Sequence, residues 1–353
     1  MFQSISIKNL RAITELKIDN FGQVNLFVGD NNCGKTTVLE ALFLLIGATN
    51  PHLPVNINGL RGLPFIYREL WPTFFRNMDV SLPIEIVGQS QHNQEQHTLN
   101  IKAKFEKEIE SKPVEPGSDI ISLKVGNGET SQNVLPNGLI LSYSNSERPE
   151  INNISEVFEK NNKVEFQGKK DIPFQGEILS PNQALEWKNK FALVQRKKRI
   201  PEVLSLLQKI EPNITDLRLN EVGLLEVDIG HPRLIPVNLM GGGVLKYLSV
   251  ALAMLNYKDG IVLIDEIENG LHHYAQQTLW QAVFSWAQKL NVQVFAATHS
   301  YECIKAFRNS MTDSLFESEA KLYRIERKDE NFKSIEFNPD ELARFLEKNW
   351  EMR

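Results

Sequence analysis

The stretch GDNNCGKTT, residues 29–37, limits what this chain can fold into more than any other part of the sequence. It matches the pattern G-x-x-x-x-G-K-[ST], in which each fixed position has a chemical task. Gly29 and Gly34 let the backbone curl so that successive N–H groups point inward at phosphate oxygens. Lys35 supplies a positive charge for the β- and γ-phosphates, and Thr36 offers its hydroxyl to Mg²⁺. The stretch therefore predicts a nucleoside triphosphate site.

The residues on either side of this loop favour that interpretation over a coincidental match in a strand-to-helix turn. VNLFV, residues 24–28, is typical of a short buried strand, and Thr37–Gly47 has helical spacing. A helix that begins at about Lys35 directs its positive dipole end at the same anion. Cys33 suggests a small filler residue, and the alternative is a redox-sensitive thiol. The predicted cofactor-binding set is completed by Asp30, Asn31, Asn32, Cys33 and Thr37.

GIVLIDEIENGLHH, residues 260–273, carries the second signal. Ile261–Ile264 predicts a strand buried on both faces, as in a parallel sheet. Asp265 follows at its carboxyl end, where open α/β sheets bind ligands, and is predicted to hold Mg²⁺ directly or through water. Glu266 comes next and is predicted to act as the general base that polarises the attacking water.

Two further stretches fit the same chemistry. QVFAATHS, residues 293–300, predicts a buried strand that ends in polar groups. His299 is one of them and is predicted to contact the γ-phosphate, although a lone histidine more often has a structural role. Gly241, Gly242 and Gly243 open a predicted helix and offer a second anion site. One nucleotide does not need two cradles from one chain, so this glycine turn is expected to close over the ATP of a second subunit. A flexible hinge is the alternative.

The composition of the chain limits its number of domains, its partners and its location. The 353 residues suffice for one large or two modest domains. A net charge of −5 excludes a uniformly basic nucleic-acid coat but not a local basic patch. Cys33 and Cys303 suggest neither a disulfide framework nor a zinc site, so a reducing cytoplasm is expected. No segment approaches 18 consecutive apolar residues, and a membrane-spanning subunit is not expected.

The remaining pattern is mostly α/β in character. Residues 2–8 and 13–19 predict an antiparallel pair of strands, and 48–80 an irregular excursion. Strands 82–88, 97–107, 120–126 and 138–144 predict a meander, and residues 144–185 are polar with little periodicity. A helical stretch over 184–210 is interrupted at Pro201. Strands and helices then alternate to a final helix near 340–349.

Phosphate loop, glycine-led helix, acid strand and strand-end histidine, in that order, resemble the ABC-type ATPase heads of the RecF, SMC and overcoming-lysogenisation-defect (OLD) group. SISIKNLRAITELKI and NLFVGDNNCGKTTVLEAL resemble the opening of that group, DEIENGLHH its magnesium strand and D-loop, ATHS its H-loop, and ELARFLEKNWEMR the end of its ATPase domain. The resemblance covers residues 1–47 and about 236–353. It implies a P-loop NTPase fold with a mixed central sheet, an antiparallel β subdomain and a helical lobe. It also implies ATP and Mg²⁺ as cofactors and a head-to-head dimer that encloses two ATPs.

On this basis the chain is expected to form a single head over residues 1–353. It would comprise a phosphate-loop lobe with the meander (1–143), an irregular or helical insertion (144–235), and a lobe with signature helix, magnesium strand and H-loop (236–353). Two departures from the group stand out. Met240 replaces the signature serine, and no acidic nuclease cluster follows His299 in the remaining 54 residues, whereas OLD nucleases continue into a Toprim domain. Any cutting of nucleic acid is therefore expected to fall to another protein.

The leading hypothesis is an ATPase switch that dimerises, or assembles further, on ATP and controls a separately encoded effector in antiphage defence or DNA maintenance. The alternative is a RecF-like repair ATPase that binds duplex DNA directly. Its basic surface would be WKNKFALVQRKKR (187–199), where six of 13 residues are Lys or Arg, unless that run is an ordinary solvated helix face. A transporter's ATPase subunit is a third hypothesis, and the RecF-like opening argues against it.

Overall fold

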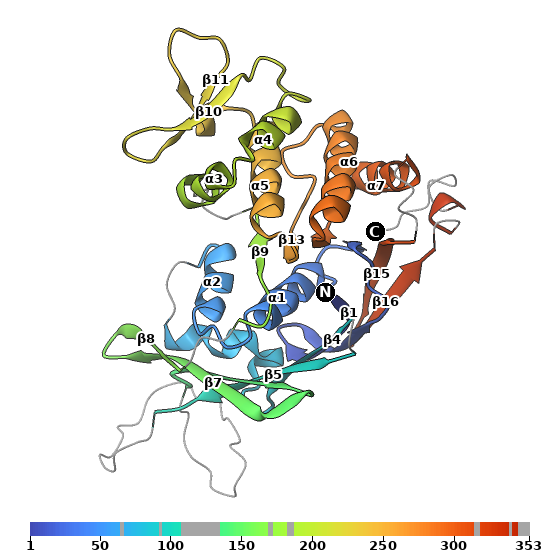
Figure 1. The fold of residues 1–353 in the computed structure, drawn as a ribbon. Coiled ribbons are helices and arrows are strands. Elements are labelled where there is room, and N and C mark those ends of the chain that lie inside the picture. Colours follow the sequence, from blue (N-terminus) through green and yellow to red (C-terminus); the bar gives the residue numbers. More distant parts are fainter. Residues whose placement is uncertain are drawn as a thin grey trace, which may run out of the picture.

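A computed structural model describes residues 1–63, 67–91, 94–106, 135–168, 172–181, 187–313, 318–338 and 341–344. Two large sheets, a small third sheet and a group of helices make up the described part (Figure 1). The predicted strand 120–126 lies outside the described residues. Of the predicted final helix, only 341–344 are described, and they are helical.

A six-stranded sheet holds the phosphate loop. Its strand order is β16-β15-β3-β14-β13-β9, and β15, β3, β14, β13 and β9 run parallel, whereas β16 is an antiparallel edge. The mixed central sheet expected from the sequence is thereby confirmed. Its members are β3 (Val24–Val28), β9 (Gly176–Leu179), β13 (Ile261–Ile264), β14 (Gln293–Ala297), β15 (Ala320–Lys328) and β16 (Asn331–Phe337).

A seven-stranded antiparallel sheet lies below the central one in Figure 1, in the order β2-β1-β4-β5-β6-β7-β8. The predicted antiparallel pair at the start of the chain forms its first two strands. β4 pairs with the other side of β1, and β5, β6, β7 and β8 then follow in chain order, each antiparallel to the one before. Its members are β1 (Phe2–Leu10), β2 (Ile13–Ile18), β4 (Ile84–Ser90), β5 (Gln96–Lys104), β6 (Gly138–Asn145), β7 (Arg148–Lys160) and β8 (Lys163–Gly168).

Helix α1 (Lys35–Ile46) lies between the two large sheets and is apolar on nearly every side, as a helix covered all round requires. Its buried leucines meet apolar side chains from both sheets. On the opposite face of the central sheet, a second apolar cluster joins α5 (Gly242–Asn256), α6 (His273–Leu290) and α7 (Tyr301–Asp313). The phosphate-loop strand thus has a packed core on each side.

Helices α3 (Trp187–Arg196) and α4 (Ile200–Leu207) pack on α5 and, with a three-stranded sheet, form the top of the molecule in Figure 1. The small sheet contains β10 (Asp216–Leu219), β11 (Leu225–Asp228) and β12 (Ile235–Pro236), followed by the single 3₁₀ turn η4 (Val237–Leu239). The predicted break in this helical stretch is confirmed, because Pro201 lies in the first turn of α4, where its missing N–H costs nothing.

Two predictions for the middle of the chain are wrong. Residues 48–80 are not wholly irregular: they contain α2 (Leu53–Leu60) and the 3₁₀ turns η1 (Arg68–Leu70), η2 (Pro72–Phe74) and η3 (Arg76–Met78). Nor is the stretch from 144 onward free of regular structure, since β7, β8 and β9 fall within it. β7 and β8 extend the seven-stranded sheet, and β9 completes an edge of the central sheet.

Candidate nucleotide-binding site

The phosphate loop connects β3 to α1 through two glycines with left-handed backbone. Gly29 has φ 138° and Gly34 has φ 103°, conformations that favour glycine. A Cβ at Gly29 would lie 2.3 Å from the carbonyl oxygen of Ile325 on β15, so packing requires glycine there as well. Gly34 is also the N-cap of α1, and the loop therefore leads directly into the helix end that attracts anions.

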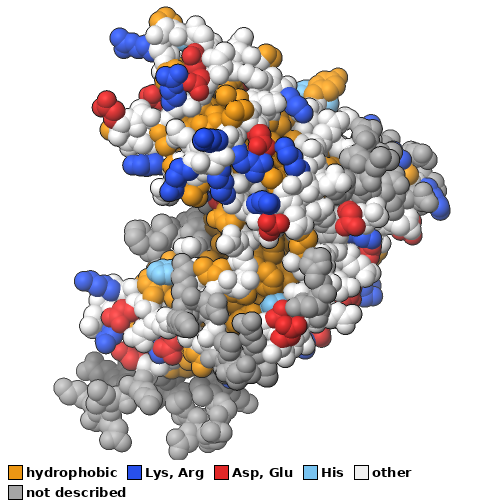
Figure 2. All heavy atoms as spheres, in the orientation of Figure 1, with side chains coloured by type: hydrophobic (Ala, Val, Ile, Leu, Met, Phe, Trp, Pro, Cys, Tyr) orange, Lys and Arg blue, Asp and Glu red, His pale blue; other side chains and the backbone are white. Residues whose placement is uncertain are grey.

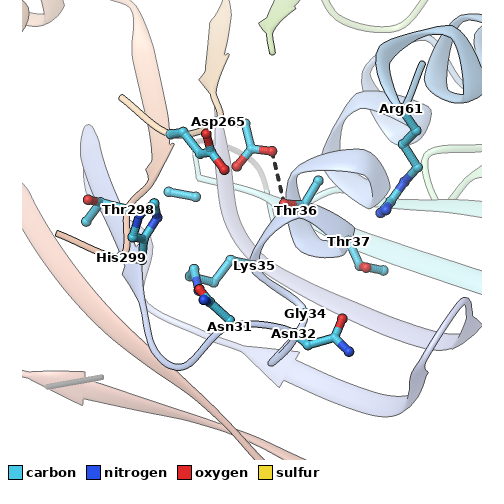
Figure 3. Close-up of a pocket in the computed structure, with 12 residues that line it drawn as sticks. Asn31, Asn32, Gly34, Lys35, Thr36, Thr37, Arg61, Asp265, Thr298 and His299 are labelled. Atoms are coloured by element: carbon cyan, nitrogen blue, oxygen red, sulfur yellow. Dashed lines mark hydrogen bonds between the residues drawn. The ribbon is translucent and has the colours of Figure 1, made fainter. Parts of the chain in front are cut away.

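Lys35 reaches back over this loop (Figure 3). Its Nζ donates to the carbonyl oxygens of Gly29 and Asp30, at 2.8 Å each, and lies 3.8 Å from Cys33 Sγ. The ammonium group therefore lies inside the curl of the loop, where phosphate oxygens would meet it.

Thr36 and Asp265 come together although they are 229 residues apart. Thr36 Oγ1 donates to Asp265 Oδ2 at 2.9 Å, the interaction drawn as a dashed line in Figure 3. Burial raises the pKa of the Asp265 carboxyl, the Thr36 hydrogen bond lowers it, and the neighbouring Glu266 carboxylate raises it further. A buried carboxylate with a like charge beside it favours a cation.

These two groups fit Mg²⁺, which prefers oxygen ligands and takes few of them from the protein when phosphates and water supply the rest. Among the described residues, no cluster of three or more His, Cys, Asp or Glu side chains offers a complete metal cage. Thr36 and Asp265 would hold the ion at the mouth of the phosphate loop, as expected for an ion that arrives with a nucleotide.

A pocket of about 190 Å³ lies over the loop. It brings the predicted general base Glu266 and the predicted γ-phosphate contact His299 together with the loop residues, from the ends of β13 and β14. A second hollow, beside Gly29, Asp30 and Asn31, adjoins it at His299. The 190 Å³ pocket is lined by Asn31, Asn32, Gly34, Lys35, Thr36, Thr37, Arg61, Asp265, Glu266, Ala297, Thr298 and His299.

His299 is anchored through its main chain. Its N–H donates to Glu268 Oε1 at 3.1 Å, and its Nδ1 lies 3.3 Å from the same oxygen. The imidazole itself is about half exposed at the rim of the pocket. A side chain so placed can reach a phosphate at the γ end without being locked in the core.

Arg61 also lines the pocket, although no sequence motif points to it. It follows α2 and points toward the first turn of α1 (Figure 3), while its Nε bonds Glu40 Oε1 at 2.6 Å. Glu40 is buried and also accepts from Arg11 Nε at 3.1 Å. The Glu40 carboxylate raises the pKa of Arg61 against the effect of burial. Only the folded α2 brings Arg61 to the site, so no local pattern marks it.

Cys33 is buried, and burial raises the pKa of its thiol despite the opposing Lys35 charge. A thiol held neutral is a poor nucleophile, which favours the filler interpretation over a redox switch. The second cysteine, Cys303, is buried too, with its pKa raised to about 12.

The glycine turn Gly241–Gly243 lies outside the pocket of its own chain and precedes and begins α5. Gly242 instead approaches Gly270, in the loop that follows the acid pair. None of the three glycines has a positive φ, and a Cβ at any of them would meet at most ordinary contacts. The turn and the phosphate loop of one chain are therefore not parts of one pocket.

Half of the basic residues in the run 187–199 have partners within the chain. Lys190 pairs with Glu177, Lys197 Nζ donates to main-chain carbonyls at the end of α5, and Arg199 forms two bonds to Glu202. Figure 2 shows Lys and Arg side chains gathered on the upper part of the visible face, near α3, with acidic side chains among them. Three of the six Lys and Arg side chains therefore bind groups of their own chain and are not free to form a basic surface.

Three comparisons with known proteins bear on this fold and site. The profile of the AAA_21 family, described as "AAA domain, putative AbiEii toxin, Type IV TA system", matches residues 24–304. Fold and site thus define a P-loop ATPase. The chain belongs to the AAA_21 family.

A protein of Helicobacter pylori named "ATP/GTP phosphatase" is 26% identical over 94% of both chains. An uncharacterized protein of Methanocaldococcus jannaschii, MJECL10, is 50% identical over 48 residues, 14% of this chain and 22% of that one. Among solved structures, an Smc head domain of Pyrococcus furiosus, bound to the C-terminal domain of ScpA, aligns over 99% of both chains with a TM-score of 0.51 and 9% identity. That likeness concerns the fold. In the described part of the chain, no helix is long and apolar enough to cross a membrane.

Proposed function

We propose that two copies of this chain bind two ATP–Mg²⁺ between them and hydrolyse ATP there. Each copy would supply the phosphate loop for one nucleotide and the glycine turn Gly241–Gly243 for the other. Mg²⁺, when bound, neutralises charge on the β- and γ-phosphates. Lys35 binds the same phosphates, Glu266 takes the proton of the attacking water, and His299 contacts the γ-phosphate.

The observation that carries this proposal is that the fold does not need its three glycines. Glycine at the start of a helix loses more conformational freedom than alanine would. Gly242 and Gly243 lie in the first turn of α5, neither has a positive φ, and a Cβ at either would meet only ordinary contacts at 3.5 Å or more. Glycine is used without an internal reason where a backbone must come close to a ligand or another chain. A partner's triphosphate, drawn to the N–H groups at the start of α5, supplies that reason.

The same proposal extends to a switch. ATP-dependent closure and hydrolysis-dependent opening would recruit or release a separately encoded effector, in antiphage defence or DNA maintenance. Support comes from the family description, which refers to a toxin of a toxin–antitoxin system, and from the resemblance to RecF, SMC and OLD heads.

Glu266→Gln tests the dimer. The amide keeps the shape of the side chain but cannot accept a proton, so hydrolysis should fall roughly a hundredfold or more while ATP still binds. Light scattering after size exclusion with ATP and Mg²⁺ should then show a dimer, and a monomer without nucleotide. Lys35→Ala/Glu266→Gln is the control and should stay monomeric. A monomeric Glu266→Gln protein saturated with ATP would contradict the proposal.

A further inference from the structure

The acid turn that carries Glu266 is held in an uncommon conformation. Glu266 has φ 45°, in the left-handed region that a residue with a Cβ seldom adopts. Such backbone persists only where its surroundings fix it. Some contact must therefore stabilise this turn.

Lys246 makes that contact. It lies on α5, in the helix turn after the glycines, and its Nζ donates to Glu266 O at 2.9 Å and approaches Asp265 O at 3.4 Å. Burial lowers the pKa of Lys246 to about 8, against the opposing effect of the Glu268, Asp265 and Glu266 carboxylates. A lysine seldom occupies such a position without a specific partner.

Glu268 provides the opposite charge. Its side chain is only 9% exposed, and Oε1 is used by the main-chain N–H of His299. Its Oε2 is buried and has no hydrogen-bond partner among the described residues. Of the three carboxylates, Glu268 raises the pKa of Lys246 the most. Lys246 thus connects α5 to the acid turn, and Glu268 connects the acid turn to the end of the His299 strand.

We propose that Lys246 is a positioning residue for ATP hydrolysis: its ammonium group holds the main chain of Glu266 in its left-handed conformation, and Glu268 balances its charge. Lys246 does not touch the nucleotide. It acts by fixing the direction in which the Glu266 carboxylate leaves the backbone. This inference rests on the proposed role of Glu266.

The test separates positioning from simple support of the fold. Lys246→Met removes the ammonium but keeps most of the length of the side chain. It leaves Glu268 as an uncompensated buried charge, so the melting temperature should fall. Lys246→Met/Glu268→Gln removes both charges, and the melting temperature should recover toward that of the wild type. The hydrogen bond to Glu266 O is absent in both variants.

We therefore expect kcat to stay at least about tenfold low in the double variant, with KM for ATP within about twofold of wild type. If the single variant does not fold, the double variant carries the test. Recovery of kcat together with the melting temperature, or a rise in KM that matches the loss, would overturn the proposal. Lys321→Met, which breaks an ion pair with Glu336 on the same sheet, is the matched control and should leave kcat unchanged.

Glu266→Gln, measured in parallel, distinguishes a failure of the proposed role of Glu266 from a failure of the proposed role of Lys246. Wild-type hydrolysis by that variant would overturn the assignment of Glu266 as base, and with it the proposed site chemistry. A fully active Lys246→Met/Glu268→Gln protein beside an inactive Glu266→Gln protein would overturn only the role of Lys246.

Discussion

Single residues at this site differ in how far the sequence reveals them. Lys35, Thr36 and Asp265 follow from short local patterns, because their chemistry needs fixed neighbours along the chain. Arg61 and Lys246 do not, because each reaches the site through a tertiary contact, with Glu40 in one case and Glu266 O in the other. The local pattern specifies the phosphate loop and the acid strand, and the fold adds the residues that hold these segments in place.

Gly243→Ala gives a residue-scale prediction. A Cβ there would meet Gly270 O and Leu271 Cδ2 at 3.7 Å, an ordinary contact, and alanine favours the helix. The free energy of unfolding should rise by about 0.4–1 kcal/mol. ATP hydrolysis should nevertheless fall at least about tenfold, since the added methyl group obstructs a partner's triphosphate.

Denaturant unfolding and steady-state hydrolysis of the same preparation check both effects. The control is Gly59→Ala, at a helical position in α2 where a Cβ would find open space. That variant should gain stability without losing activity. Full activity in Gly243→Ala would show that the glycine turn does not approach a partner's triphosphate during hydrolysis.

Among the elements, the sequence predicts strands that alternate or are wholly apolar, and it misses β7, β9, β15 and β16, which do neither. β7 is a polar strand toward the edge of its sheet, so only part of one face needs apolar residues. β9 has four residues, GEIL, and depends on pairing with β13, which lies far away in the chain. Such strands are set by their neighbours in the sheet, and a periodicity argument cannot find them.

His97 connects three strands of the seven-stranded sheet and gives an element-scale prediction. Its Nε2 lies 3.0 Å from Ser90 Oγ on β4, and its Nδ1 lies 2.7 Å from Tyr143 Oη on β6. Burial lowers the pKa of His97, and the chain's N-terminal ammonium lowers it further, while Glu95 opposes both.

The folded pKa lies below the unfolded value near 6.5, so below pH 6.5 the unfolded chain binds the proton that the folded chain excludes. Stability should therefore fall as the pH drops from 6.5 toward the folded pKa. Melting temperatures at pH 7.5 and 5.5 should differ less in His97→Gln than in wild type. His231→Gln, at an exposed position, should keep the wild-type difference. An unchanged difference in His97→Gln would exclude His97 as its source.

At the scale of the whole molecule, the sequence predicts the fold class correctly because the motifs mark both ends of the ATPase core. It does not reveal how strands from the two ends of the chain alternate in the central sheet. β3, near the start, lies between β14 and β15, and β16 lies beside β2, where Ser334 Oγ donates to Lys17 O. The effector, its trigger and any DNA contact remain predictions, since no pattern along one chain encodes a second molecule.

Mixing two inactive variants gives a molecule-scale prediction. Lys35→Ala removes the phosphate-loop charge, and Gly241→Glu places a carboxylate on the glycine turn without disturbing its own fold, since nothing lies within 4 Å. In a mixed dimer, one shared site keeps an intact loop and an intact turn. Neither variant alone has a complete site, so hydrolysis by the mixture should exceed the sum of the two separate rates severalfold.

Hydrolysis rates of each variant alone, and of the mixture at several ratios, check this. The recovered rate should peak at an equal ratio. A mixture no faster than the sum of its parts would contradict a site shared between subunits.

The placement of β3 between two strands from the far end of the chain also affects synthesis. On the ribosome, the nucleotide loop emerges early. The strands β14 and β15, which flank β3, and β13, which leads to Asp265, emerge only near the end. The nascent chain therefore carries the loop without the acid turn for most of its translation. Engagement of ATP thus becomes a sign of a finished polypeptide, and a truncated product should lack both the ligand and the stability that it confers.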